Sequence, residues 1–113
     1  MIAEVEGKAV PTVYRGAKAG QAPDLTPRLN VDVQITKDGT IKPGHGVSLD
    51  SSKAELAKVG FPDAYEIDQS TVASQLKISQ RGGRPTHYEI VPADGISLSF
   101  EEYSRLISKI RFL

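Results

Sequence analysis

A histidine and a carboxylate stand two residues apart in residues 86–91, and this pair is the first candidate for chemistry in the sequence. The segment is rich in β-branched and aromatic residues and has no internal glycine or proline, which predicts a strand. Alternation then places His87 and Glu89 on one face and Tyr88 and Ile90 on the other. A carboxylate on a polar face can stabilise the positive charge that develops when a glycosidic bond breaks. The alternative is a solvated face without a chemical role.

Two further polar residues stand beside glycines. Arg15 precedes Gly16 after a short run of apolar residues, and Ser48 follows Gly44 and Gly46 closely. Because glycine has no side chain, it lets a ligand approach the backbone closely, so both neighbourhoods are candidate binding segments. The alternatives are a surface ion pair for the arginine and a local backbone hydrogen bond for the serine.

Short strands and turns are expected to position these residues. Besides residues 86–91, we expect strands over residues 10–14, 31–35, 64–67 and 76–79, and a short strand near Val47. Residues 16–30 hold several glycines and prolines, which predicts a loop. The sequence Lys-Asp-Gly-Thr at residues 37–40 predicts a hairpin turn.

Two helices are expected where a serine stands three residues before a glutamate, which is the spacing of a capping box. The first helix covers residues 53–59, and Gly60 ends it. The second begins after Ser99 and is amphipathic. Its apolar face carries Phe100, Tyr103, Leu106, Ile107 and Ile110.

This set of elements predicts an α+β fold with a curved or split, mainly antiparallel sheet and one or two helices, because strands and helices do not alternate regularly. The 113 residues fit a single domain, since two domains would be too small to hold separate cores. Residues 1–8 are weakly patterned, and we expect a frayed arm or the cut end of a larger protein there.

Composition excludes several classes of function. Lys+Arg and Asp+Glu both count 14, so the net charge is zero. The composition therefore lacks the excess of positive charge expected of a protein that binds nucleic acid or an anionic membrane. The absence of cysteine excludes disulfides, thiol nucleophiles and thiolate metal sites. Two histidines without a patterned partner do not predict a metal site. No apolar run approaches the ~20 residues of a membrane span, and no secretory signal is expected, so export would need another route.

Three polar segments follow one another along the chain: Tyr-Arg-Gly around Arg15, Gly-Val-Ser-Leu-Asp around Ser48, and Thr-His-Tyr-Glu ending at Glu89. Their order resembles the arginine–serine–glutamate arrangement of ADP-ribosyltransferase toxins. More closely, the chain is similar to small type VI secretion effectors that have an ADP-ribosylating-toxin fold and are neutralised by a cognate immunity protein. The resemblance covers most of residues 12–110.

The resemblance implies that NAD is a substrate and that three residues are catalytic. Glu89 would stabilise the positive charge at the ribosyl centre when nicotinamide leaves, and would bind the 2′-hydroxyl. Arg15 would hold the pyrophosphate or a ribose with its planar donor fork, which lysine would not reproduce. Ser48 would orient Arg15, Glu89 or the nicotinamide ribose.

The resemblance also implies further contacts with NAD. His87 would bind the ribose or the target group, and Gly46 would let the ligand approach closely. Tyr14 would pack against the nicotinamide ring, whereas Tyr88 is expected in the core. Two positions depart from the family pattern, because Val47 replaces a threonine and His87 stands where many transferases have glutamate or glutamine.

The function implied is that of a bacterial toxin domain in interbacterial competition. It would act in the cytoplasm of a target cell after delivery by a secretion system, on a macromolecule that the sequence does not identify, and an immunity protein would neutralise it. Two alternatives stay open at this point: a toxin of the same fold that kills by binding, and a non-enzymatic α+β binding module.

Overall fold

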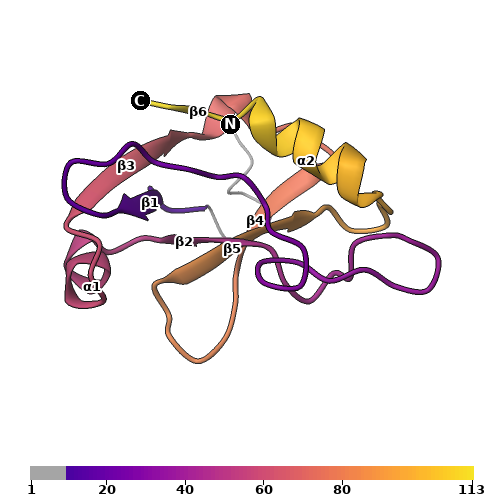
Figure 1. Ribbon diagram of the computed structural model, residues 1–113, viewed down its shortest axis with the longest axis horizontal. Coiled ribbons are helices and arrows are strands. Elements are labelled where there is room, and N and C mark those ends of the chain that lie inside the picture. Colours follow the sequence, from indigo (N-terminus) through magenta and orange to yellow (C-terminus); the bar gives the residue numbers. More distant parts are fainter. Residues whose placement is uncertain (1–9) are drawn as a thin grey trace.

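Six strands form one curled sheet in the order β4-β5-β2-β1-β3-β6 in the computed structural model, and every neighbouring pair is antiparallel (Figure 1). The structure describes residues 10–113. The strands are β1 (Tyr14–Ala17), β2 (Val47–Asp50), β3 (Asp63–Asp68), β4 (Leu76–Gln80), β5 (His87–Pro92) and β6 (Arg111–Phe112). The helices are α1 (Lys53–Lys58), the 3₁₀ turn η2 (Gln69–Thr71) and α2 (Phe100–Ser108). The expected α+β class is confirmed; the arm expected at residues 1–8 lies outside the described residues.

The pairing between strands is weakest in the middle of the sheet. Strands β1 and β2 share a single pair of backbone partners, Tyr14 with Asp50, whereas β1 and β3 share four. The sheet therefore consists of two better-paired halves, β4-β5-β2 and β1-β3-β6, that meet at one point. Near this point, side chains can make the contacts between strands that backbone hydrogen bonds make elsewhere in the sheet.

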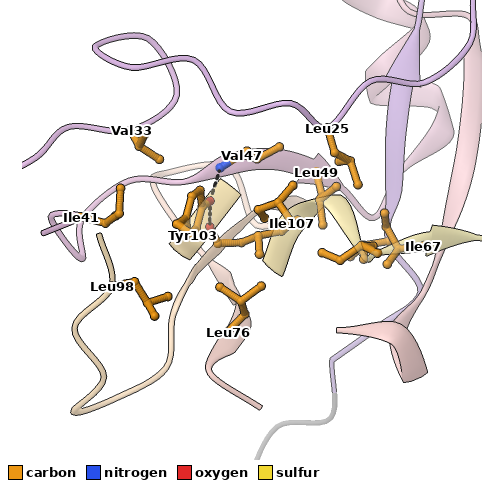
Figure 2. Close-up of a cluster of buried hydrophobic side chains, with 13 residues drawn as sticks. Leu25, Val33, Ile41, Val47, Leu49, Ile67, Leu76, Leu98, Tyr103 and Ile107 are labelled. Carbon is orange, nitrogen blue, oxygen red and sulfur yellow. Dashed lines mark hydrogen bonds between the residues drawn. The ribbon is translucent and has the colours of Figure 1, made fainter. Parts of the chain in front are cut away.

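One face of β2 and β5 packs against α2. Val47 and Leu49 of β2 lie beside Tyr103 and Ile107 of α2, as Figure 2 shows. The capping box starts this helix, because the Ser99 side chain accepts from the Glu102 N–H and the Glu102 carboxylate accepts from the Ser99 N–H. The buried cluster comprises Val13, Leu25, Val33, Ile41, Val47, Leu49, Ile67, Leu76, Ile90, Leu98, Tyr103, Ile107 and Ile110.

The hydroxyl of Tyr103 ties α2 to both central strands. It accepts a 3.2 Å hydrogen bond from the Val47 N–H of β2 and donates one to the Ile90 carbonyl of β5 (Figure 2). Burial raises the pKa of this phenol, so the hydroxyl stays neutral. The same close packing explains why residue 46 is a glycine, because a Cβ there would lie 1.9 Å from the Ile90 carbonyl oxygen.

Most turn and cap predictions are confirmed, including the helix after Ser52 and the turn at Gly39, whose φ is +81°. The strand expected over residues 31–35 is absent. Asn30 adopts a positive φ of 66°, and the Asp32 carboxylate accepts from the Arg28 N–H. These local bonds coil the segment, so its alternating pattern is not extended and only isolated bridges form there.

Both ends of the described chain also differ from the expectation. The first strand begins at Tyr14 instead of residue 10, so Arg15 lies inside it and not after it. Pro11, which lacks an N–H donor, precedes the ladder. At the other end, α2 stops at Ser108, and Arg111–Phe112 form a strand against β3 that the sequence did not indicate.

Candidate functional site

Strands β2 and β5 bring four polar residues to one face of the sheet. Ser48 pairs with Glu89, and Asp50 pairs with His87, as cross-strand partners. Directly opposed residues of an antiparallel pair point to the same face. On the other face Tyr88 packs against the core cluster, as the alternation predicts. Ser48 and Glu89, which are 41 positions apart, are therefore neighbours in space.

Arg15 joins this face from β1. Its Nη1 donates to the Ser48 carbonyl at 2.7 Å and contacts Ser48 Oγ at 3.4 Å, and its Nε donates to the Asp24 carbonyl at 2.9 Å. The guanidinium thus bridges β1 and β2 just beyond their single ladder pair. Burial lowers the pKa of Arg15, and the nearby carboxylates of Asp32 and Asp24 oppose that shift. Within residues 10–113, the hydrogen bonds of Arg15 use Nε and Nη1 and none uses Nη2.

Two adjoining cavities meet at Arg15. The smaller, of about 210 Å³, reaches Ser48, His87 and Arg84, and the larger, of about 470 Å³, follows residues 17–28. Both cavities are lined by Arg15, Gly16, Arg28 and Phe61. We call the two together the Arg15 groove.

Glu89 is held by two donors. One carboxylate oxygen accepts from the Gly46 N–H at 3.1 Å, and the other lies 2.8 Å from His87 Nε2. The side chains of His87 and Glu89 are 23% and 13% exposed. His87 lines the smaller cavity, whereas Glu89 does not and is hydrogen-bonded to His87.

Two residues expected to contact NAD lie elsewhere. The ring of Tyr14 lines neither cavity, and the Lys53 ammonium lies 5.1 Å from its centroid. Gly46 corrects our expectation of close ligand approach, because the room left by its missing Cβ is taken by the Ile90 carbonyl and the Tyr103 hydroxyl. Its N–H, and not its missing side chain, is what serves the site.

The groove contains residues that sequence reasoning missed. Arg28 pairs with Asp32 at 3.1 Å and lines both cavities. Phe61 is the aromatic wall: a Cβ on Gly16 would lie 2.7 Å from its Cβ. No local pattern marks Phe61, because the loop after α1 carries it onto β1. Arg84 also lines the smaller cavity, from the basic, glycine-rich segment of residues 80–85.

Within residues 10–113, no group of three or more histidine, aspartate or glutamate side chains could hold a metal ion. None of the helices described is long and apolar enough to cross a membrane. Comparisons of the chain with protein-family models, curated proteins and solved structures gave no match.

Proposed function

We propose that this chain is a bacterial toxin domain with an ADP-ribosyltransferase-like fold, which binds NAD along the Arg15 groove and transfers its ADP-ribose to a macromolecule. The observation that carries the proposal is the place of Arg15, at the junction of two cavities and in contact with Ser48. NAD consists of two nucleoside halves joined by a pyrophosphate. A groove of two compartments with guanidinium groups at their junction suits such a molecule.

The lining of the groove suggests the orientation of NAD. Arg15 and Arg28 line both compartments, where the pyrophosphate would lie. The smaller cavity contains Ser48 and His87, so it would receive the nicotinamide riboside half. The larger cavity would receive the adenosine half, and Phe61 offers an apolar face at the boundary.

NAD supplies the ribosyl centre, whose bond to nicotinamide breaks with the electron pair leaving on nicotinamide. A nucleophilic atom of the macromolecule forms the new bond to the same carbon and gives its proton to solvent. Glu89 stabilises the positive charge that develops there. Each carboxylate oxygen has two lone pairs, so Glu89 can accept from a ribose hydroxyl while keeping its bonds to Gly46 and His87. Ser48 orients Arg15, and its hydroxyl lies on the face of Glu89.

The proposal includes a setting that rests on the resemblance in the sequence. The toxin acts in the cytoplasm of a target cell after delivery by a secretion system, and a cognate immunity protein neutralises it. A second candidate function is a toxin of the same fold that kills by binding, without transfer. The position of Glu89 outside the lining of the smaller cavity favours that candidate.

Expression in the bacterial cytoplasm from a tightly repressed promoter tests the proposal. We expect the wild type to arrest growth, and Arg15→Ala, Ser48→Ala and Glu89→Gln to be harmless although folded, as judged by circular dichroism. Arg105→Ala, on the exposed side of α2, is the control that stays toxic. Toxicity in all three site variants contradicts the site, whereas toxicity of Glu89→Gln alone favours killing by binding. Harmless wild-type protein contradicts a toxin.

A further inference from the structure

Arg84 links a buried carboxylate to the imidazole of the site. Its Nη2 donates to Asp50 Oδ2 at 3.3 Å and lies 3.4 Å from His87 Nδ1. Asp50 is only 2% exposed, and its other oxygen accepts from the Ser52 N–H at 2.8 Å. A buried carboxylate with an arginine partner is strongly anchored, because removal of the partner leaves an uncompensated charge. The buried carboxylate therefore fixes the end of the half-exposed Arg84 side chain.

The partners of His87 determine which of its nitrogens carries the proton. A guanidinium has only donors, so Nδ1, which faces Arg84, must accept. A carboxylate accepts, so Nε2, which lies 2.8 Å from Glu89, must donate. Two neighbours on opposite sides of the ring thus assign the same tautomer, with the proton on Nε2.

We propose that Arg84, anchored by Asp50, is a positioning residue that holds His87 in the Nε2–H tautomer and thereby fixes the Glu89 carboxylate. The chain of contacts runs from Asp50 through Arg84 and His87 to Glu89, and the Gly46 N–H holds the far oxygen. The effect of this arrangement on catalysis rests on the proposed function, whereas the geometry itself does not depend on that function.

The loop that carries Arg84 is fastened at several points. The Gln80 side-chain amide donates to the main-chain oxygens of Arg81, Gly82 and Arg84. Arg84 Nη1 also lies 3.7 Å from Glu55 of α1. The bonds of the Gln80 amide, and the main-chain bonds of His87 to Arg81 and Arg84, do not involve the guanidinium. Loss of the guanidinium therefore changes the environment of the imidazole without opening the loop.

The test is direct observation of the imidazole in ¹⁵N-labelled protein, without NAD. At a pH where the ring is neutral, correlations from its carbon-bound protons to both nitrogens report which nitrogen is protonated. We expect the Nε2–H tautomer of His87 in the wild type. In Arg84→Met the ratio of tautomers should shift by about threefold to tenfold toward Nδ1–H, the size of one hydrogen bond. Arg84→Lys, which keeps a charged donor, should restore most of the wild-type ratio.

An Nδ1–H tautomer or an even mixture in the wild type overturns the proposal, and so does an unchanged ratio in Arg84→Met. Asp50→Asn is the second variant, because it releases the arginine while leaving the contact atoms of His87 in place, and it should shift the ratio in the same direction. If the protein transfers ADP-ribose, Arg84→Met should lower kcat more than it raises KM. Absence of transfer contradicts the proposed function alone, since the tautomer is measured without NAD.

Discussion

Ser48 of β2 and Glu89 of β5 oppose each other as cross-strand partners, and Arg15 of β1 donates to the same serine. The three residues come together because β2 lies between β1 and β5 in the sheet. Because β1 and β2 pair at one position only, the Ser48 carbonyl accepts a hydrogen bond from the Arg15 guanidinium. The arginine is thus both a structural bridge and a cation exposed to the groove.

Arg15→Lys should weaken NAD binding by at least about tenfold, because a single ammonium cannot replace a fork that holds two carbonyls and still offers a donor to phosphate. Titration calorimetry with NAD measures the change. The control is Arg105→Lys, the same substitution on an exposed face of α2. Equal NAD affinity in wild type and Arg15→Lys would contradict the groove as the binding site.

Gly46→Ala should be strongly destabilising, by about 3 kcal/mol or more, because the new Cβ would lie 1.9 Å from the Ile90 carbonyl oxygen and backbone must move. Gly44→Ala is the matched control: its Cβ would approach only Arg81 Nη2, at an ordinary 3.6 Å. Urea unfolding compares the two variants. Similar stabilities for both would show that the corner between β2 and β5 is looser than described.

Tyr103→Phe should lower the free energy of unfolding by about 1–3 kcal/mol, because it leaves the buried Val47 N–H and Ile90 carbonyl without their partner. Tyr65→Phe removes a hydroxyl whose bond to the Gln21 carbonyl is exposed, and should cost less than about 0.5 kcal/mol. Chemical denaturation distinguishes them. Equal losses would mean that the buried hydroxyl has no special part in joining α2 to the sheet.

Acid should weaken the capping box of α2. The Ser99 N–H holds the pKa of Glu102 below its ordinary value, so the carboxylate stabilises the fold above the unfolded-state pKa. This contribution is lost as the pH falls through the lowered folded-state pKa. The melting temperature of the wild type should therefore exceed that of Glu102→Gln at pH 7, and the gap should narrow from about pH 5 to pH 3.

Glu101→Gln is the control for that experiment, since Glu101 makes no capping contact in the described residues. Its gap to the wild type should show less dependence on pH than that of Glu102→Gln. A gap for Glu102→Gln that stays constant across the acid range would contradict a role for its ionised form.

Local chemistry made part of this fold predictable. Serine caps, the turn at Gly39 and the alternation around Glu89 act within a few residues, and the structure contains all three features. The segment around Val31 was misread because its pattern matches a strand, while bonds between Arg28 and Asp32 coil it.

The site was predictable only where its residues belong to patterned strands. Ser48 and Glu89 lie on strands that the sequence indicates, whereas Arg15 was expected after its strand and lies inside it; the sheet order brings the three together. Phe61 and Arg28 reach the groove from loops through long-range packing, which no local spacing encodes. The same limit applies to Gly46, because the space that a Cβ would need there is occupied by the carbonyl of Ile90, 44 positions away.

Label transfer from NAD tests the central claim most directly. Purified wild-type protein and Glu89→Gln are each incubated with bacterial lysate and NAD labelled in its adenylate phosphate, and macromolecules are separated from free nucleotide. Our account predicts that the wild type labels a macromolecule and that Glu89→Gln, folded to the same extent, labels none. Absence of label with the wild type, or equal label with both proteins, would contradict ADP-ribosyl transfer at this site.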